Sequence, residues 1–148
     1  MSTINASFSR DNNRIPITNL GIVSTLPTIT YAAGTTGAIG ATTLATVTGV
    51  IAARVFALCG VDLAGATATI SVGVTGNAAA LIAQTTATNI DAGLFWVDTG
   101  PASIEALPAI NLVAGNIIQT IGTAAISAGT LTYYIAWNPI SPDGNLTF

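Results

Sequence analysis

Carboxylates are nearly the only residues of this chain that could do chemistry. Its 148 residues include six acids, three arginines and one cysteine, but no His and no Lys. Without these two types there is no Ser-His or Cys-His nucleophile pair, Schiff base or P-loop, and most zinc and iron sites are excluded. A glycosidase needs only two carboxylates, and Asp91, Asp98 and Glu105 are the closest set in sequence. Because acids at turns and strand ends usually cap turns or pair with cations, we expect no catalytic residue, no metal and no cofactor.

The composition indicates a surface covered by neighbouring subunits. Hydrophobic residues make up 51% of the chain and charged residues 6%, with a mean hydropathy of +0.69, whereas an ordinary soluble domain is about 25% charged. A membrane span needs about 20 consecutive apolar residues, yet the most apolar stretch, Val47 to Val61, has Arg54 in its middle. We therefore expect self-association and no membrane partner.

Charge and cysteine content limit the remaining partners and the compartment. A net charge of -3 and a pI of about 4.2 leave no basic patch to neutralise phosphates, so nucleic acid is not expected as a partner. The single Cys59 cannot form an internal disulfide, which fits a buried thiol in a reducing compartment. The N-terminus has no basic segment followed by an apolar one, so we expect no signal peptide and folding in a cytoplasm.

Period-two patterns predict strands along most of the chain. Residues 66–74 and 130–138 alternate between apolar and polar side chains. Val50 to Cys59 is apolar on both faces, so one face should meet the core and the other a loop, an arm or another subunit. Arg54 lies on the Phe56 face, where we expect it to reach a rim or to pair with an acid. The other strand candidates are residues 15–24, 28–32, 42–48, 80–86, 94–97, 103–107 and 116–123.

These elements predict an all-β fold, a single β-sandwich of about 8–10 strands with jelly-roll or Ig-like topology. The expected organisation is an N-terminal arm (1–14), the sandwich (15–138) and a C-terminal tail (139–148), with both ends extended. Four aromatic residues at strand spacing are expected in the core or at an interface, in preference to a carbohydrate platform. They are Trp96, Tyr133, Tyr134 and Trp137.

The N-terminal arm carries the one polar cluster that stands out. Arg10, Asp11 and Arg14 lie within five residues, and they include two of the three cations of the chain. One interpretation is a solvated tail. The other is an inter-subunit clamp, in which the guanidinium groups bind carboxylates or backbone carbonyls of the next subunit.

Several segments resemble small structural proteins of tailed-bacteriophage virions. They are Ser9 to Ile17, Gly65 to Asn77 with Ile82 to Thr86, and Gly129 to Pro139, and together they span most of the chain. The resemblance implies a capsid decoration or cement protein on the virion surface. Such a protein is β-rich, often a homotrimer, and binds where subunits of the major capsid protein lattice meet. No catalytic motif accompanies the resemblance.

Two other roles stay open at this point. A tail or head-fibre adhesin would also be β-rich and oligomeric, and it would bind host glycans through its aromatic residues and loops. A strand-donating filament subunit would use an arm to complete a neighbour's sheet. The placement of the arm distinguishes the three roles: on a capsid, in a sister sheet, or free.

Overall fold

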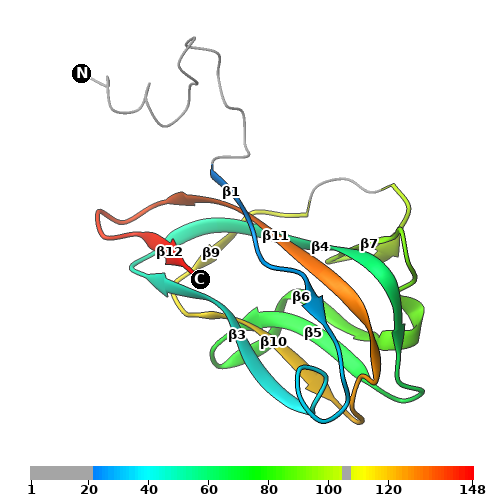
Figure 1. Ribbon diagram of the computed structural model, residues 1–148. Coiled ribbons are helices and arrows are strands. Elements are labelled where there is room, and N and C mark those ends of the chain that lie inside the picture. The colour runs from blue at the N-terminus through cyan, green and yellow to red at the C-terminus, as the bar shows by residue number, and fades with distance from the viewer. Residues whose placement is uncertain (1–21, 105–107) are drawn as a thin grey trace.

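The structure, a computed structural model, describes residues 22–104 and 108–148, which form two antiparallel β-sheets packed face to face (Figure 1). This all-β sandwich confirms the fold class expected from the sequence. Within these residues the regular elements are strands and one 3₁₀ turn at Ala87–Asn89. In chain order the strands are β1 (Ile22–Thr25), β2 (Ile29–Thr30), β3 (Gly40–Thr48), β4 (Ile51–Ala64), β5 (Thr69–Val74), β6 (Asn77–Thr86), β7 (Phe95–Val97), β8 (Gly100–Ala102), β9 (Asn111–Val113), β10 (Ile117–Gly122), β11 (Ala128–Pro139) and β12 (Asn145–Thr147).

The two sheets have seven and five strands. The seven-stranded sheet has the order β1-β11-β4-β7-β8, with β2 also beside β11 and β9 also beside β4. The five-stranded sheet has the order β12-β3-β10-β5-β6. The longest pairing joins β4 to β11 through the centre of the first sheet. Side chains of these two strands therefore lie alternately in the core and on the outer face of that sheet.

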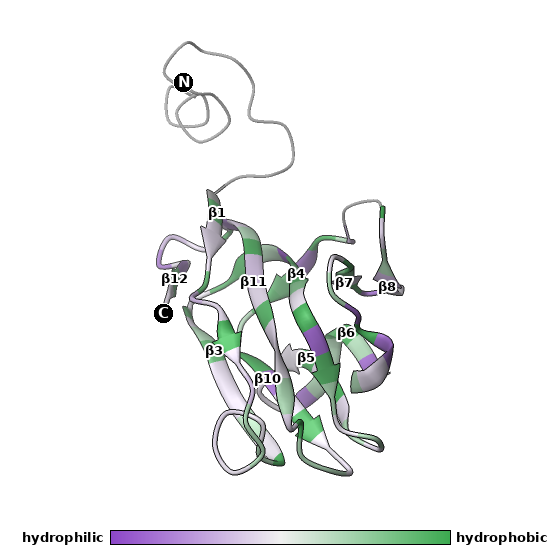
Figure 2. Cartoon of the chain, turned by 45° about the vertical axis from the view of Figure 1, so that its right-hand side comes forward, coloured by the Kyte–Doolittle hydropathy of each residue, from purple (hydrophilic) through white to green (hydrophobic). Residues whose placement is uncertain are grey.

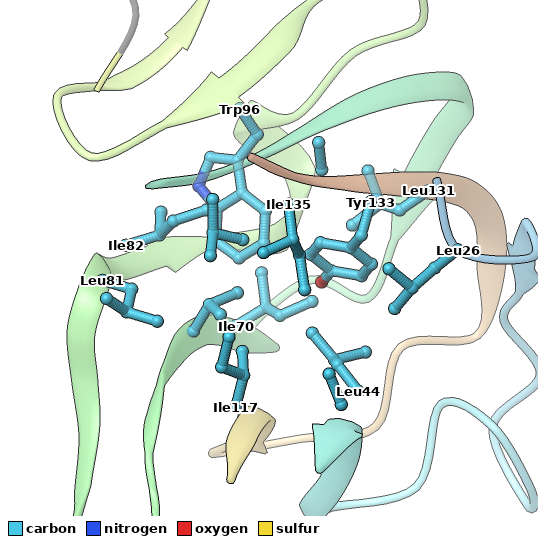
Figure 3. Packing of buried hydrophobic residues seen from close by; sticks show 14 of the residues in the cluster. Leu26, Leu44, Ile70, Leu81, Ile82, Trp96, Ile117, Leu131, Tyr133 and Ile135 are labelled. Atoms are coloured by element: carbon cyan, nitrogen blue, oxygen red, sulfur yellow. The ribbon is translucent and has the colours of Figure 1, made fainter. Parts of the chain in front are cut away.

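The core lies between the sheets and is filled by alternate residues of the central strands. From β11 it receives Leu131, Tyr133 and Ile135, and from β10 it receives Ile117 and Ile121, all buried. Figure 3 shows Tyr133 and Ile135 on one side of the core, with Ile70 and Ile117 of the other sheet below them. Full burial of one isoleucine or leucine side chain contributes about 1.5–3 kcal/mol, so this layer holds the two sheets together.

The structure has twelve strands in its described part, more than the number expected. The unforeseen ones are β8, β9 and β12, each of three residues, which is too short for an alternating pattern to be recognised. Strand β8 occupies Gly100–Ala102, between the strands expected at 94–97 and 103–107. The strand expected at 103–107 is not found at 103 and 104, which lie outside any strand, while 105–107 lie outside the described residues.

The C-terminal tail contributes an edge strand to the second sheet. Within residues 139–148, β12 pairs with Thr46–Thr48 of β3, and Leu146 is buried in the core. The turn before it is fixed by the backbone N–H of Val50, which donates to Oγ of Ser141 at 2.8 Å, and by the Ser141 hydroxyl, which donates to Oδ1 of Asp143 at 2.6 Å. Leucine burial and these bonds explain why the tail follows the sheet.

The open edges of the sandwich differ in length and regularity. Strands β1, β8 and β12 are edges of three or four residues, whereas the fourth edge, β6, has ten. Its register against β5 shifts twice, between Ile70 and Val72 and between Val72 and Val74. At the second shift the backbone of Asn77 lies so close to Gly73 that a side chain there would clash. The long edge is therefore bulged and not flat.

Candidate interaction surface

Three of the four aromatic residues singled out from the sequence lie in the core. Trp96 and Tyr133 are fully buried, with ring centroids 6.4 Å apart and planes inclined by 59°. Figure 3 shows them side by side above Ile70 of the opposite sheet. Nε1 of Trp96 donates to Oγ1 of Thr85 at 3.0 Å, and Nε1 of the buried Trp137 donates to Oγ of Ser24 at 3.2 Å. Their indole groups are engaged inside the sandwich and form no platform on its surface.

A buried polar network joins the two sheets through Gln119 of β10. Its Oε1 accepts hydrogen bonds from the hydroxyls of Tyr31 at 2.7 Å and Tyr133 at 2.9 Å. All three side chains are buried. Desolvation by burial raises the pKa of both tyrosines above the usual value, so the hydroxyls stay protonated and remain donors. The network fixes the relative position of the sheets, and it offers no access for a ligand.

The fourth aromatic residue, Tyr134, faces away from the core, on the outer face of the seven-stranded sheet. Its ring stacks on Phe56 of β4, with centroids 5.2 Å apart and an interplanar angle of 12°. The next row joins Thr132, Leu58 and Phe95 across three strands. Figure 2 shows that hydrophilic colour occupies only short stretches of the sheets. The two-sided apolar pattern of the sequence is thus present, because β4 packs on the core with one face and exposes aromatic and aliphatic groups with the other.

Apolar residues continue toward both edges of this outer face. Leu112 of β9 pairs with Ala52 and is 74% exposed, while Val23 of β1 pairs with Ala136 and is 50% exposed. Monomeric proteins rarely expose large contiguous apolar patches, and such patches usually mark interaction sites. We call the set Val23, Ala52, Arg54, Phe56, Leu58, Phe95, Leu112, Tyr134 and Ala136 the outer-face patch.

Arg54 lies in the middle of the outer-face patch, and its Nε has no hydrogen-bond partner among the described residues. The residue is only 9% exposed, and its Nε is buried with no hydrogen-bond partner. On one side Arg54 pairs with Ala136 of β11; on the other side, β9 pairs with β4 up to Ala53 and β7 pairs from Ala57. The Nε atom is therefore shielded from solvent, and the expected position of the guanidinium at a rim or beside an acid stays a prediction.

The carboxylates considered for catalysis do not form a site in the described part of the chain. Asp91 is exposed next to a turn, Asp98 is half-buried at the turn between β7 and β8, and Glu105 lies outside the described residues. Asp62 accepts a hydrogen bond from the backbone N–H of Ala92 at 2.6 Å, and Asp143 accepts one from Ser141. Residues 22–104 and 108–148 contain no cluster of three or more His, Cys, Asp or Glu that could hold a metal ion.

Cys59 is a buried thiol at the end of the predicted strand Val50 to Cys59. Its Sγ lies 3.1 Å from the carbonyl oxygen of Val61 and 3.4 Å from that of Ile90. Burial, and secondly the negative charge of Asp62, raise the pKa of the thiol. A protonated, shielded thiol of this kind is unreactive.

The clamp residues expected in the N-terminal arm, Arg10, Asp11 and Arg14, lie outside the described residues. Comparison of the chain with protein-family models, with curated proteins and with solved structures finds no match. No helix in the described segments is long and apolar enough to cross a membrane. The outer-face patch is thus the described feature that bears most directly on function. The sequence signalled it only through the two apolar faces of Val50 to Cys59.

Proposed function

We propose that this chain is a non-enzymatic structural protein of a bacteriophage virion, a self-associating decoration protein that binds and stabilises the assembled capsid. The expected assembly is a trimer seated on the major capsid protein lattice. A protein that binds the assembled lattice and not its free subunits stabilises the shell by mass action.

The observation that carries the proposal is the outer-face patch. It combines a stacked pair, Phe56 and Tyr134, with exposed Leu112 and a buried arginine whose Nε has no partner in the described residues. Protein interfaces are enriched in aromatic residues and arginine at their centres. A chain with 6% charged residues has little else to keep such a face soluble.

A second line of support is the way the polar chemistry is used inside the fold. The indoles of Trp96 and Trp137 and the hydroxyls of Tyr31 and Tyr133 bond to partners within the sandwich. These groups serve the packing of the sheets. A structural protein needs a rigid fold and an apolar surface for binding. The hydrogen-bonded sandwich and its outer-face patch fit these two needs.

The test uses native mass spectrometry of the full chain and co-sedimentation with heads assembled from the major capsid protein of the same genome. We expect an oligomer at micromolar concentration that sediments with heads. Leu112→Asp, which places a charge on the outer-face patch, should weaken both. Ile39→Asp is the matched control, because Ile39 is 61% exposed beside β3 of the other sheet. A stable monomer that stays in the supernatant with intact heads would overturn the proposal.

A further inference from the structure

The unpartnered Nε of Arg54 indicates what kind of group binds to the outer-face patch. We propose that the patch binds the N-terminal segment of a neighbouring copy of this chain, with the carboxylate of Asp11 from that copy on the guanidinium of Arg54. The inference rests on the self-association in the proposed function and names the contact responsible for it.

Arg54 supplies the first argument. A guanidinium stays charged at any physiological pH and has five N–H donors, and burying it unpaired is costly. Its Nε is buried and has no hydrogen-bond partner among the described residues. Arginine binds carboxylates in a two-pronged geometry that satisfies Nε together with a terminal nitrogen. The missing group is therefore a carboxylate or another strong acceptor.

The charge inventory narrows the source of that acceptor. The described residues hold one cation and four carboxylates, a net charge of -3, whereas residues 1–21 hold two arginines and one carboxylate, a net charge of +1. Asp62 and Asp143 already accept hydrogen bonds in their own turns. The N-terminal segment thus complements the body in charge, and Asp11 is its sole acid.

Strand β1, which follows the N-terminal segment in the chain, lies close to the outer-face patch. Strand β1 forms the edge of the seven-stranded sheet, two strands away from β4, in the same row as Arg54 through Val23 and Ala136. Neighbouring strands are about 4.8 Å apart, and the ten residues from Asp11 to Gly21 can span at most about 35 Å. Reach is therefore not limiting.

The direction of β1 favours a neighbouring copy over the same chain. Ile22, its first residue, pairs with Trp137, whereas Thr25 pairs with Tyr134. The first residue of β1 therefore lies toward the Pro139 end of β11, and the last lies in the row of Phe56. Folding back over its own Arg54 would need a reversal directly before β1. A neighbour can receive the segment without such a reversal, and repeated head-to-tail contacts of this kind form a ring such as a trimer when the rotation between copies closes.

The apolar residues of the N-terminal segment are suited to the apolar surface around Arg54. Ile15 and Ile17 follow Arg14 at alternate positions, so in an extended chain they lie on one face. Phe56, Leu58 and Leu112 offer the complementary surface. The contact would combine one shielded ion pair with apolar packing on either side of it.

Cross-linking tests the location of the segment. In a Cys59→Ala chain, cysteines are introduced at Asn12 and at Ala52, which lies one row from Arg54, and are treated with a short bismaleimide. We expect covalent dimers and trimers. The matched control pairs Asn12→Cys with Ala83→Cys on β6 of the other sheet, which should yield none. Products linked only within one chain, or no products from either pair, would overturn the proposal.

Charge variants test the ion pair itself. Asp11→Asn should weaken self-association about 10- to 100-fold, as expected for a shielded charge-assisted hydrogen bond, while Asp62→Asn should leave it unchanged. Arg54→Met should weaken association as much as Asp11→Asn, with no further loss when the two are combined. Because the substitution removes a buried unpaired cation, Arg54→Met should not lower the free energy of unfolding of the monomer. A structural role for Arg54 would predict the opposite.

The outcomes separate this inference from the proposed function. If the chain oligomerises and binds heads but Asp11→Asn has no effect, the contact assigned here is wrong and the function stands. An effect of Glu105→Gln in place of Asp11→Asn would assign the acceptor to Glu105 and would also refute the inference. A monomer under all conditions would remove both.

Discussion

Replacing Gln119 with leucine is expected to destabilise the sandwich by about 2–4 kcal/mol. Leucine cannot accept the hydrogen bonds that the hydroxyls of Tyr31 and Tyr133 donate to Oε1 at 2.7 and 2.9 Å. The two hydroxyls can then bond to each other, which leaves one buried donor unsatisfied. A lost hydrogen bond costs about 1 kcal/mol and an unsatisfied buried group about 1–3 kcal/mol, which gives the stated range.

The same reasoning predicts that further substitutions restore stability. The triple variant Gln119→Leu with Tyr31→Phe and Tyr133→Phe removes every member of the network, so it should lie within about 1 kcal/mol of wild type and above the single variant. The control is Gln84→Leu on the exposed side of β6, with an expected change below about 0.5 kcal/mol. The assay is urea denaturation followed by fluorescence of Trp96 and Trp137, at concentrations where native mass spectrometry gives the same oligomer for all variants. A triple variant less stable than Gln119→Leu would refute the reasoning.

Three further outcomes follow from the described contacts. Burial raises the pKa of Tyr31 and Tyr133, so the unfolded chain loses these protons first; the free energy of unfolding should be steady below about pH 10 and fall above it by about 1.4 kcal/mol per pH unit for each tyrosine. Urea titrations on either side of that pH check this, and the double Phe variant should lack the slope. Gly129 has a φ of +113°, and a Cβ there would lie 2.5 Å from the Asp62 carbonyl oxygen, so Gly129→Ala should lower the free energy of unfolding by more than about 1 kcal/mol. The control Gly34→Ala, at a position with open space around it, should change that free energy by less than about 0.5 kcal/mol. Equal losses for the two variants in a denaturation assay would contradict the steric argument. Cys59 should not react with Ellman's reagent until urea unfolds the chain, because the thiol is buried and its pKa is raised; rapid labelling of the native protein would show that it is accessible.

Long alternating patterns predicted the sheets, and short strands escaped them. Residues 66–74 and 130–138 contain or lie within β5 and β11, because six or more alternating residues define a face. Strands β8, β9 and β12 have three residues each, and their pairing depends on partners far away in sequence. Leu146 enters the core because β3 provides an edge for β12, which the local sequence of the tail does not reveal.

The sequence predicted that an apolar outer face exists, but not which residues meet on it. Two apolar faces on Val50 to Cys59 indicated that one of them would need a cover outside the core. The stacking of Phe56 on Tyr134 could not be foreseen, because it depends on the register between β4 and β11. The position of Arg54 beside Ala136 likewise depends on that register. Periodicity assigns a residue to a face, and only the assembled sheet determines its neighbours.

The bulges of β6 bear on what happens when many copies crowd together. A ten-residue edge strand without a charged residue or a proline is a template for edge-to-edge pairing, and this chain has too few charges to guard it in the common way. The double register shift against β5 twists that edge out of line. For molecules packed side by side at high local density, this bulged edge should oppose continuous sheet pairing from one copy to the next.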